Sequence, residues 1–396
     1  MKPKRTNPIL PRLLGAAFAS LASLSAQSIS INFGANQTSS AVDEAAKTSG
    51  AVPIAGNLWN NTTVNGGGTL GSLIDSTGAT TAASVTWTAQ NTWQSGSSGA
   101  TATSENGDLT KGYLDDSGAG WTVNMDSPYL LNDIYVIHAT DQGNPATMSA
   151  VSVNGTFYTG NGAGGTVAVG GSGSSWSAAN FSTADVLVES TNFIKVEDQT
   201  GVSLAGLNSS PGRSAIAGLQ VVNAYTGTLS FWDTNGATAG SGNAGGTWGT
   251  DSFWTADATG SVATGAWSSG SAAVFSAGTD GTGLLTVTVN GTQTADAIWV
   301  QEGDITLSGG VIDLSAGSGI LRGDDPDASF YALTIDSSIQ AADLTIAGEV
   351  EFGGSNTITG TVTVLGTALV ASNQSWNQIA GSGTLDLFGG DLTVGA

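Results

Sequence analysis

Apolar and polar residues alternate in short runs along most of this chain, and glycine, asparagine, serine or aspartate separates one run from the next. Near the start, Ile29, Ile31 and Phe33 show this period of two, which places alternate side chains on opposite faces of a β-strand. The small residues between runs favour turns. The pattern predicts an all-β protein whose early strands lie at 29–33, 84–89, 121–125, 130–138, 148–153, 156–158, 186–189, 193–196 and 215–222.

The spacing of these runs predicts a β-sandwich over residues 28–225, because short strands at regular intervals are typical of two packed sheets. Asn154-Gly155 lies between two predicted strands and is a strong signal for a tight hairpin. The one helix-like fragment of this part is Val42 to Lys47.

From residue 284 onward, very short apolar runs alternate with glycine, asparagine, serine or aspartate. This pattern predicts a parallel β-helix over 284–396, in which only stacked coils bury a core. At roughly 20 residues per coil, the segment would form about five coils. The expected strands lie at 284–289, 297–300, 305–307, 311–314, 333–335, 344–346, 350–352, 361–364, 368–370, 385–387 and 392–394.

Both ends of such a stack expose its core. The aromatic-rich segment 226–283, with Trp248, Trp254 and Trp267, is expected to form a cap or linker before the first coil. At the other end, the pattern stops at 392–396 without a polar cap. Two interpretations follow: the sequence is a truncated piece, or a partner covers its final coil.

Residues 1–26 have the layout of a secretory signal peptide. Four basic residues precede an apolar run from Leu13 to Leu24, and the small residues Ser25-Ala26 follow it. A run of about a dozen residues is too short for a stable membrane anchor. We therefore expect an exported protein, at the cell surface or extracellular, whose mature chain is not stably inserted in a membrane.

Removal of this segment makes the chain more acidic. The signal holds four of the nine Lys and Arg residues, so the mature chain keeps five basic residues against 31 acidic ones, a formal charge of −26. Such a chain repels nucleic acid phosphates and anionic membrane surfaces, which excludes nucleic acid as a partner. The chain has no cysteine, so its stability must come from burial and backbone pairing rather than from disulfides.

The residues do not indicate an enzyme, and no catalytic residue is assigned. The only histidine, His138, ends an alternating strand and is expected to be structural. Glycosidases need only two carboxylates, but the neighbours Asp43-Glu44 and Asp115-Asp116 are expected to be solvated turns because their side chains diverge. Residues 226–396 contain one basic residue, Arg322, which argues against cleavage of acidic polysaccharides.

Calcium is the one candidate cofactor, because hard cations take clustered oxygen ligands. The candidate site is the acidic turn of Asp324, Asp325 and Asp327. The alternative interpretation of these residues is a solvated turn without a cation.

Binding is a stronger functional class than catalysis, and carbohydrate is one candidate ligand, because aromatic faces stack on sugar rings and neighbouring amides bond to hydroxyls. The candidate residues are Trp59, Asn60, Asn61, Trp87 and Trp93. The alternative is that these indoles belong to the core of the sandwich.

Two parts of the sequence resemble a known family. One part resembles the entry to the repeat region of bacterial autotransporter-associated β-strand repeat proteins and comprises Phe231-Trp232-Asp233, Trp248-Gly249, Phe253-Trp254, Trp267, Ala273-Val274-Phe275, Val287-Thr288-Val289-Asn290-Gly291 and Ile305-Thr306-Leu307-Ser308-Gly309-Gly310. The other part is similar to the leading β-sandwich, of jelly-roll or galactose-binding-like type, of large secreted proteins of that kind and comprises Ile31-Asn32-Phe33-Gly34, Val52-Pro53, Trp59-Asn60-Asn61 and residues 216–222.

The resemblance implies a secreted or surface-displayed passenger. The translocating barrel and C-terminal sorting segment of such passengers are not found in this sequence, which leaves the mode of attachment open. We expect a structural or adhesive protein without catalysis, with extracellular glycans or other surface proteins as partners. The alternatives are a carbohydrate-binding module on a β-helical stalk and a glycan-degrading enzyme that uses paired carboxylates.

Overall fold

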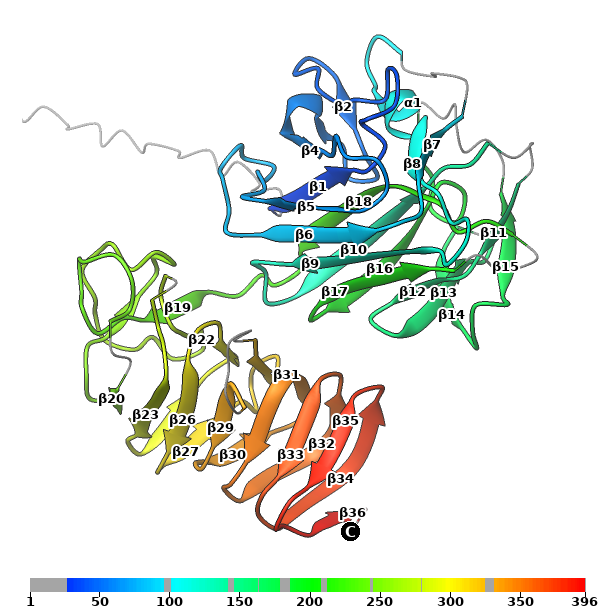
Figure 1. Cartoon of the computed structure of the whole chain (residues 1–396). Helices are drawn as coiled ribbons and strands as arrows, with labels where there is room; N and C mark the ends of the chain where they lie inside the picture. Colours follow the sequence, from blue (N-terminus) through cyan, green and yellow to red (C-terminus); the bar gives the residue numbers. More distant parts are fainter. Residues whose placement is uncertain are drawn as a thin grey trace, which may run out of the picture.

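The computed structural model describes residues 27–95, 101–141, 146–162, 164–178, 186–207, 212–242, 245–278, 280–324 and 331–395. The predicted signal peptide, 1–26, lies outside the described residues. Strands account for 50% of the structure and helices for 2%, so the prediction of an all-β protein is confirmed. Figure 1 shows the strands in two groups, which we call the N-terminal region (27–225) and the wound region (226–395).

The N-terminal region contains two seven-stranded sheets. The first has the order β16-β10-β18-β1-β4, with β8 beside β18 and β7 beside β8. Its strands are β1 (Ser28–Asn32), β4 (Trp59–Asn61), β7 (Thr92–Gln94), β8 (Gly112–Leu114), β10 (Asn132–His138), β16 (Phe193–Gln199) and β18 (Ile216–Asn223).

The second sheet is antiparallel throughout, with the order β14-β13-β12-β17-β9-β6-β5. Its strands are β5 (Gly68–Gly71), β6 (Ser84–Thr88), β9 (Trp121–Asp126), β12 (Val151–Val153), β13 (Thr156–Gly160), β14 (Thr166–Val169) and β17 (Val202–Gly206). Smaller elements complete the region, namely β2 (Thr48–Ser49), β3 (Ile54–Ala55), the 3-10 helix Gly56–Leu58, α1 (Asn106–Leu109), β11 (Ala146–Ser149) and β15 (Ser175–Ala178).

One hydrophobic cluster draws side chains from both sheets. In β9, Trp121, Val123 and Met125 are buried while the residues between them are exposed. They share a cluster with Ile29 and Ile31 of the first sheet. The period of two seen in the sequence thus separates a buried face from a solvated face.

Asn154 and Gly155 form the predicted hairpin between β12 and β13. Val153 pairs with Thr156, and the two turn residues have φ values of 48° and 84°. Positive φ at both central residues is the geometry of a type I′ turn, which asparagine and glycine tolerate best.

The prediction of a helix-like fragment at Val42–Lys47 is wrong, because these residues form irregular and turn structure. Backbone amides of this fragment form hydrogen bonds to side chains that are distant in the sequence. The Val42 amide donates to Asn61 Oδ1 at 3.1 Å, and the Glu44 amide donates to Glu105 Oε1 at 2.9 Å. These bonds replace the local ones that a helix would need.

In the wound region, strands from successive passes of the chain pair in parallel and form three rows. The first row is β19-β22-β25-β28-β31-β32-β34, the second is β20-β23-β26-β29-β31-β33-β35, and the third is β24-β27-β30-β32-β34-β36. The long strands β31, β32 and β34 each bend from one row into another. Each pass of the chain therefore lies beside the previous pass, as the lower half of Figure 1 shows.

Some strands, such as Thr292–Thr294 and Gln374–Gly381, are polar, but most strands of the wound region coincide with short apolar runs of the sequence. The strands of this region are β19 (Leu229–Trp232), β20 (Gly246–Trp248), β21 (Trp254–Thr255), β22 (Ala272–Phe275), β23 (Leu284–Val289), β24 (Thr292–Thr294), β25 (Ala297–Val300), β26 (Asp304–Ser308), β27 (Val311–Asp313), β28 (Ile320–Gly323), β29 (Leu333–Ile335), β30 (Ser338–Ala341), β31 (Leu344–Phe352), β32 (Asn356–Val364), β33 (Thr367–Val370), β34 (Gln374–Gly381), β35 (Thr384–Leu387) and β36 (Leu392–Val394).

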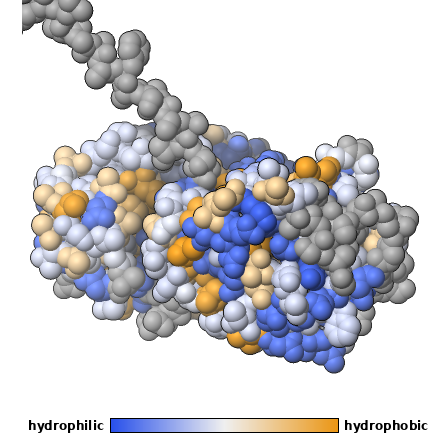
Figure 2. Space-filling model, turned by 90° about the horizontal axis from the view of Figure 1, so that it is seen from above, coloured by the Kyte–Doolittle hydropathy of each residue, from blue (hydrophilic) through white to orange (hydrophobic). Residues whose placement is uncertain are grey.

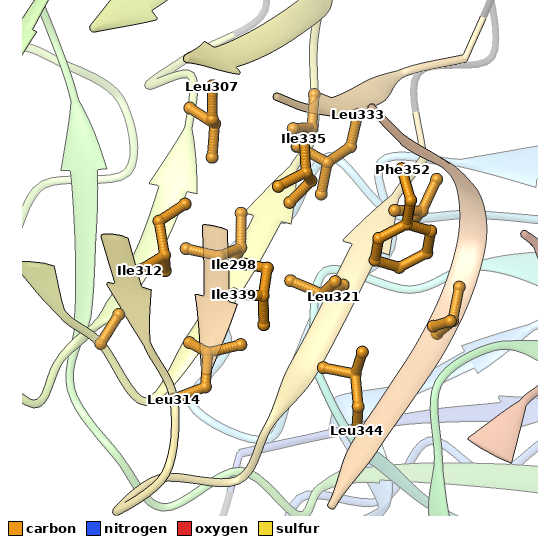
Figure 3. Packing of buried hydrophobic residues seen from close by; sticks show 14 of the residues in the cluster. Ile298, Leu307, Ile312, Leu314, Leu321, Leu333, Ile335, Ile339, Leu344 and Phe352 are labelled. Atoms are coloured by element: carbon orange, nitrogen blue, oxygen red, sulfur yellow. The ribbon is translucent and has the colours of Figure 1, made fainter. Parts of the chain in front are cut away.

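A continuous apolar core fills the space inside the winding. Ile298, Leu321, Leu333, Ile335 and Phe352 come from different passes and point toward one another in Figure 3. No single pass could bury these side chains, so each pass is stabilised by its neighbours. The face of the molecule seen in Figure 2 instead shows hydrophobic residues in separate small patches among hydrophilic ones.

The aromatic-rich segment supplies the first strands of the winding and the first layer of its core. Trp232, Trp248 and Trp254 are buried in the same cluster as the later aliphatic residues. The ring centroids of Trp232 and Trp254 are 4.9 Å apart, and those of Trp254 and Trp267 are 4.4 Å apart. The distances are in the range at which aromatic rings attract one another beyond their burial.

Candidate functional site

Four of the five candidate sugar-binding residues are buried or partly buried and are held by contacts within the protein. Trp59 and Trp87 are 3% and 2% exposed, so their ring faces are covered by protein. The Asn60 side chain donates to the carbonyls of Ser30 and Ile74, and Asn61 Oδ1 accepts from Asn32 Nδ2 at 2.9 Å. The two tryptophans therefore pack in the hydrophobic interior, and the two asparagines form hydrogen bonds to neighbouring segments of the protein.

Trp93 is the member of the set with an exposed ring. It lies on β7, pairs with Tyr113 of β8 and is 49% exposed. Three positions before it, Gln90 belongs to the lining of a shallow depression of about 420 Å³, which is formed by Thr88, Ala89, Gln90, Gly118, Ala119 and Gly120. Trp93 itself does not line this depression, but a half-exposed indole is able to stack on one face of a sugar ring.

The carboxylate pair Asp115-Asp116 is held by one arginine. Arg213 forms ion pairs with Asp115 and Asp116 and also with Asp141, at 3.2 Å. Asp116 Oδ2 further accepts from the Ser214 amide at 2.6 Å. Arg213 and the Ser214 amide thus give these carboxylates fixed partners within the N-terminal region, and charge-assisted bonds of this kind are among the stronger ones in proteins.

His138 is completely buried at the end of β10. Its Nδ1 donates to the carbonyl of Ala215 at 3.1 Å, and its ring meets that of Trp176 at a centroid distance of 5.4 Å. Burial lowers the pKa of His138 to about 4, although the Ala215 carbonyl acts in the opposite direction. The ring is therefore neutral near pH 7.

A junction between the two regions is centred on Arg322 of β28. Its side chain is almost fully buried, and Nη1 donates to the carbonyls of Tyr129 and Leu130 at 2.8 and 3.0 Å. The guanidinium lies 4.8 Å from the ring centroid of Trp299. Leu130 and Trp299 belong to one apolar cluster that spans both regions, so Arg322 closes a packed contact rather than a solvated one.

Two carboxylates complete the junction. Asp324 forms an ion pair with Arg322 and accepts from Trp299 Nε1 at 2.9 Å. Burial, and then the nearby Asp324 carboxylate, raise the pKa of Asp126, whereas Arg322 lowers it. Arg322 is the more deeply buried partner of the pair, so removal of Asp324 would leave a buried guanidinium without its ion-pair partner.

The candidate calcium turn is only partly described. Asp324 belongs to the junction, and Asp325 and Asp327 lie outside the described residues. Across the described ranges, no group of three or more His, Asp or Glu side chains is placed to hold a metal ion.

Comparison with known protein families, curated proteins and solved structures finds no match for this chain. No helix among the described residues has the length and apolar character needed to cross a membrane. The function must therefore be argued from the residues themselves.

The role of Arg322 was not predicted from the sequence. A signal was present, because Arg322 is the single Lys or Arg residue after position 225. In so acidic a segment, one retained arginine in an apolar strand indicates a specific partner. Its partners in the N-terminal region are two backbone carbonyls, which no side-chain pattern reveals.

Proposed function

We propose that this chain is an exported structural or adhesion protein without catalysis, similar to the autotransporter-associated repeat proteins that it resembles. A β-sandwich of jelly-roll or galactose-binding-like type would present a surface, and a parallel β-helix would carry it. The tryptophan-rich segment would cap the start of that helix. The proposal places the protein at the cell surface or outside the cell, with other surface proteins or glycans as partners.

One observation carries this proposal: the parallel rows around one apolar core are joined to the N-terminal region by the Arg322 junction. Parallel winding gives a rod whose stiffness comes from backbone bonds along its axis. The junction transmits that stiffness, because Arg322 contacts backbone atoms at Tyr129 and Leu130 rather than mobile side chains. A rigid wound region with the N-terminal region fixed to it would suit the presentation of a binding surface away from the cell.

The acidic composition supports the same proposal. With five basic residues against 31 acidic ones after residue 26, like charges keep copies apart and disfavour anionic partners. Proteins that work outside the cell without disulfides need large cores, and each region of this chain contains one of the two largest clusters.

Export is tested by expressing the full chain in a Gram-negative host and following it with an antibody. The expected result is protein in the medium or accessible on intact cells, with a mature N-terminus at Gln27 by mass spectrometry. Retention in the cytoplasm with residues 1–26 intact would contradict the proposal.

Binding of neutral glycans by the N-terminal region is the second candidate function, and the exposed indole of Trp93 favours it. A glycan array probed with the full chain is expected to show binding that Trp93→Ala abolishes and Trp93→Phe partly keeps, because phenylalanine retains a stacking face. Val64→Ala, at a position 48% exposed, serves as the matched control. Equal binding by Trp93→Ala and the control would exclude this site.

A further inference from the structure

Three loops converge where the wound region begins, and the Asp280 carboxylate of one loop acts electrostatically on Asp233 of another. The loop after β19 is closed by the Thr234 amide, which donates to the carbonyl of Ser241 at 2.8 Å. The Gly240 amide donates to Thr259 of the second loop at 2.9 Å. The Ser241 amide donates to Asp280 Oδ1 of the third loop at 2.7 Å.

Asp233 is the buried carboxylate of this cluster. Its side chain is 0% exposed, and Oδ1 accepts from the amides of Asn235 and Gly236, both at 3.0 Å. Oδ2 is buried without a hydrogen-bond partner among the described residues. An ionised oxygen left in this state carries a large desolvation cost.

The surroundings add negative charge rather than relieve it. Burial raises the pKa of Asp233, the amides of Asn235 and Gly236 lower it, and the carboxylates of Asp280 and then Asp257 raise it again. Asp257 has its own partners, because both of its oxygens accept bonds from Thr259 or Ser261. The bonds that Asp280 accepts, from the Ser241 amide and hydroxyl, reach only its Oδ1. Oδ2 of Asp280 is therefore the oxygen that remains to share a cation with Asp233.

The loop backbone leaves room for the Asp280 carboxylate only because residue 240 is glycine. A Cβ at Gly240 would overlap Asp280 Oδ2, and the φ of Gly240 is +95°. A third oxygen adjoins this loop: Ser276 Oγ is completely buried, has no partner among the described residues and would overlap a Cβ at Gly281. Two glycines thus admit oxygen atoms where side chains would exclude them.

No basic side chain of the wound region is free to neutralise these carboxylates. Residues 226–396 contain 17 acidic residues and one basic residue, Arg322, and Arg322 is engaged at the junction. A small hard cation with oxygen ligands would relieve the repulsion between two carboxylates of one loop cluster in so acidic a chain.

We propose that a calcium ion binds between Asp233 and Asp280, with the Ser276 hydroxyl and carbonyl oxygens of the three loops as further ligands. Two carboxylates with neutral oxygens give the weak affinity of extracellular calcium modules, about 0.1–1 mM. A site this weak fills only outside the cell, where calcium is at millimolar levels, so the calcium ion depends on the proposed export. The ion would link the three loops to one another next to the tryptophans that form the first layer of the core.

Thermal unfolding of the full chain with EDTA or with about 10 mM calcium chloride tests the site, because an ion that binds only the folded state raises the melting temperature. We expect a rise for the wild type and for the control Asp257→Asn. Asp233→Asn and Asp280→Asn should lose the rise. A rise of equal size in Asp233→Asn, or none in the wild type, would overturn the proposal.

Terbium luminescence provides a second measurement that does not depend on stability. Trp232 adjoins Asp233 in the chain, so excitation of tryptophan should sensitise a bound terbium ion, and calcium should displace it. Loss of this signal in Asp280→Asn, with retention in Asp257→Asn, supports the site; equal signals in the two variants contradict it. The export experiment is independent of both readouts, so failure of one proposal is distinguishable from failure of the other.

Discussion

At the scale of single residues, the sequence indicated which side chains are candidates for binding, but not whether they are buried or exposed. Trp59 and Trp93 occur in similar polar surroundings in the sequence, yet one is 3% exposed and the other 49%. A period of two separates two faces of a strand and does not tell which face is covered by a second sheet. Amides next to a tryptophan were equally ambiguous, since Asn60 and Asn61 hold backbone groups of neighbouring segments.

His138 makes stability depend on pH. Burial lowers its folded-state pKa to about 4 from an ordinary value of 6.5. Between these values only the unfolded chain takes up a proton at this site, so its contribution to the free energy of unfolding falls as the pH is lowered. His138→Asn, which keeps a donor for Ala215, should flatten the profile by up to about 1.4 kcal/mol per pH unit.

Urea unfolding of both proteins between pH 4 and 7.5 measures this difference. Carboxylates titrate in the same range but are common to both proteins, so they cancel in the comparison. Profiles that stay parallel over the whole range would show that the histidine is not buried as a neutral ring.

At the scale of elements, strands with apolar runs and turn residues were predicted closely, and polar strands were missed. β34 (Gln374–Gly381) has no clear alternation. Its place is fixed by contacts along the axis of the winding: Asn356 Nδ2 donates to Gln374 Oε1 at 2.9 Å, and Asn356 Oδ1 accepts from the Ile339 amide. A stacked amide of this kind depends on residues a whole turn away, which local periodicity does not report.

Ile335 of β29 tests the dependence of each turn on the shared core. Its side chain is 0% exposed and lies among residues of adjacent turns (Figure 3). Ile335→Ala should lower the free energy of unfolding by about 2–5 kcal/mol through lost burial and a cavity. Thr334→Ala, one position earlier on the outer face, should change it by less than about 1 kcal/mol. Chemical denaturation that ranks the two variants equally would contradict an inward-facing Ile335.

At the scale of the whole molecule, the all-β character was predictable and the junction was not. The carbonyls that receive Arg322 lie 193 and 192 positions away in the chain. Backbone carbonyls are present at every residue and carry no sequence signature. Only the scarcity of basic residues in the wound region indicated that Arg322 had a dedicated place.

Arg322→Ala should loosen the two regions relative to each other while each keeps its own core. Because the chain has no cysteine, spin labels can be attached at Val64→Cys and Val262→Cys, two positions that are each 48% exposed. We expect a narrow distance distribution in the parent and a broader one in Arg322→Ala. Arg322→Lys should lie between them, because lysine keeps the charge but loses the planar stack on Trp299.

An unchanged distribution in Arg322→Ala would assign the junction to apolar packing around Leu130 alone. The circular dichroism spectrum serves as the control that both regions remain folded.

The last turns of the wound region repeat at nearly constant length, so the molecule could be lengthened by adding further turns of the same kind. Asp343 and Thr361 meet across one turn at a separation of 18 residues, and Ile339 and Asn356 at 17. Each extra turn of that size would add about 4.8 Å, the spacing between neighbouring strands. In-frame duplication of a gene segment that encodes one turn would therefore lengthen this protein by one strand spacing at a time. The N-terminal region and the Arg322 junction would stay unchanged.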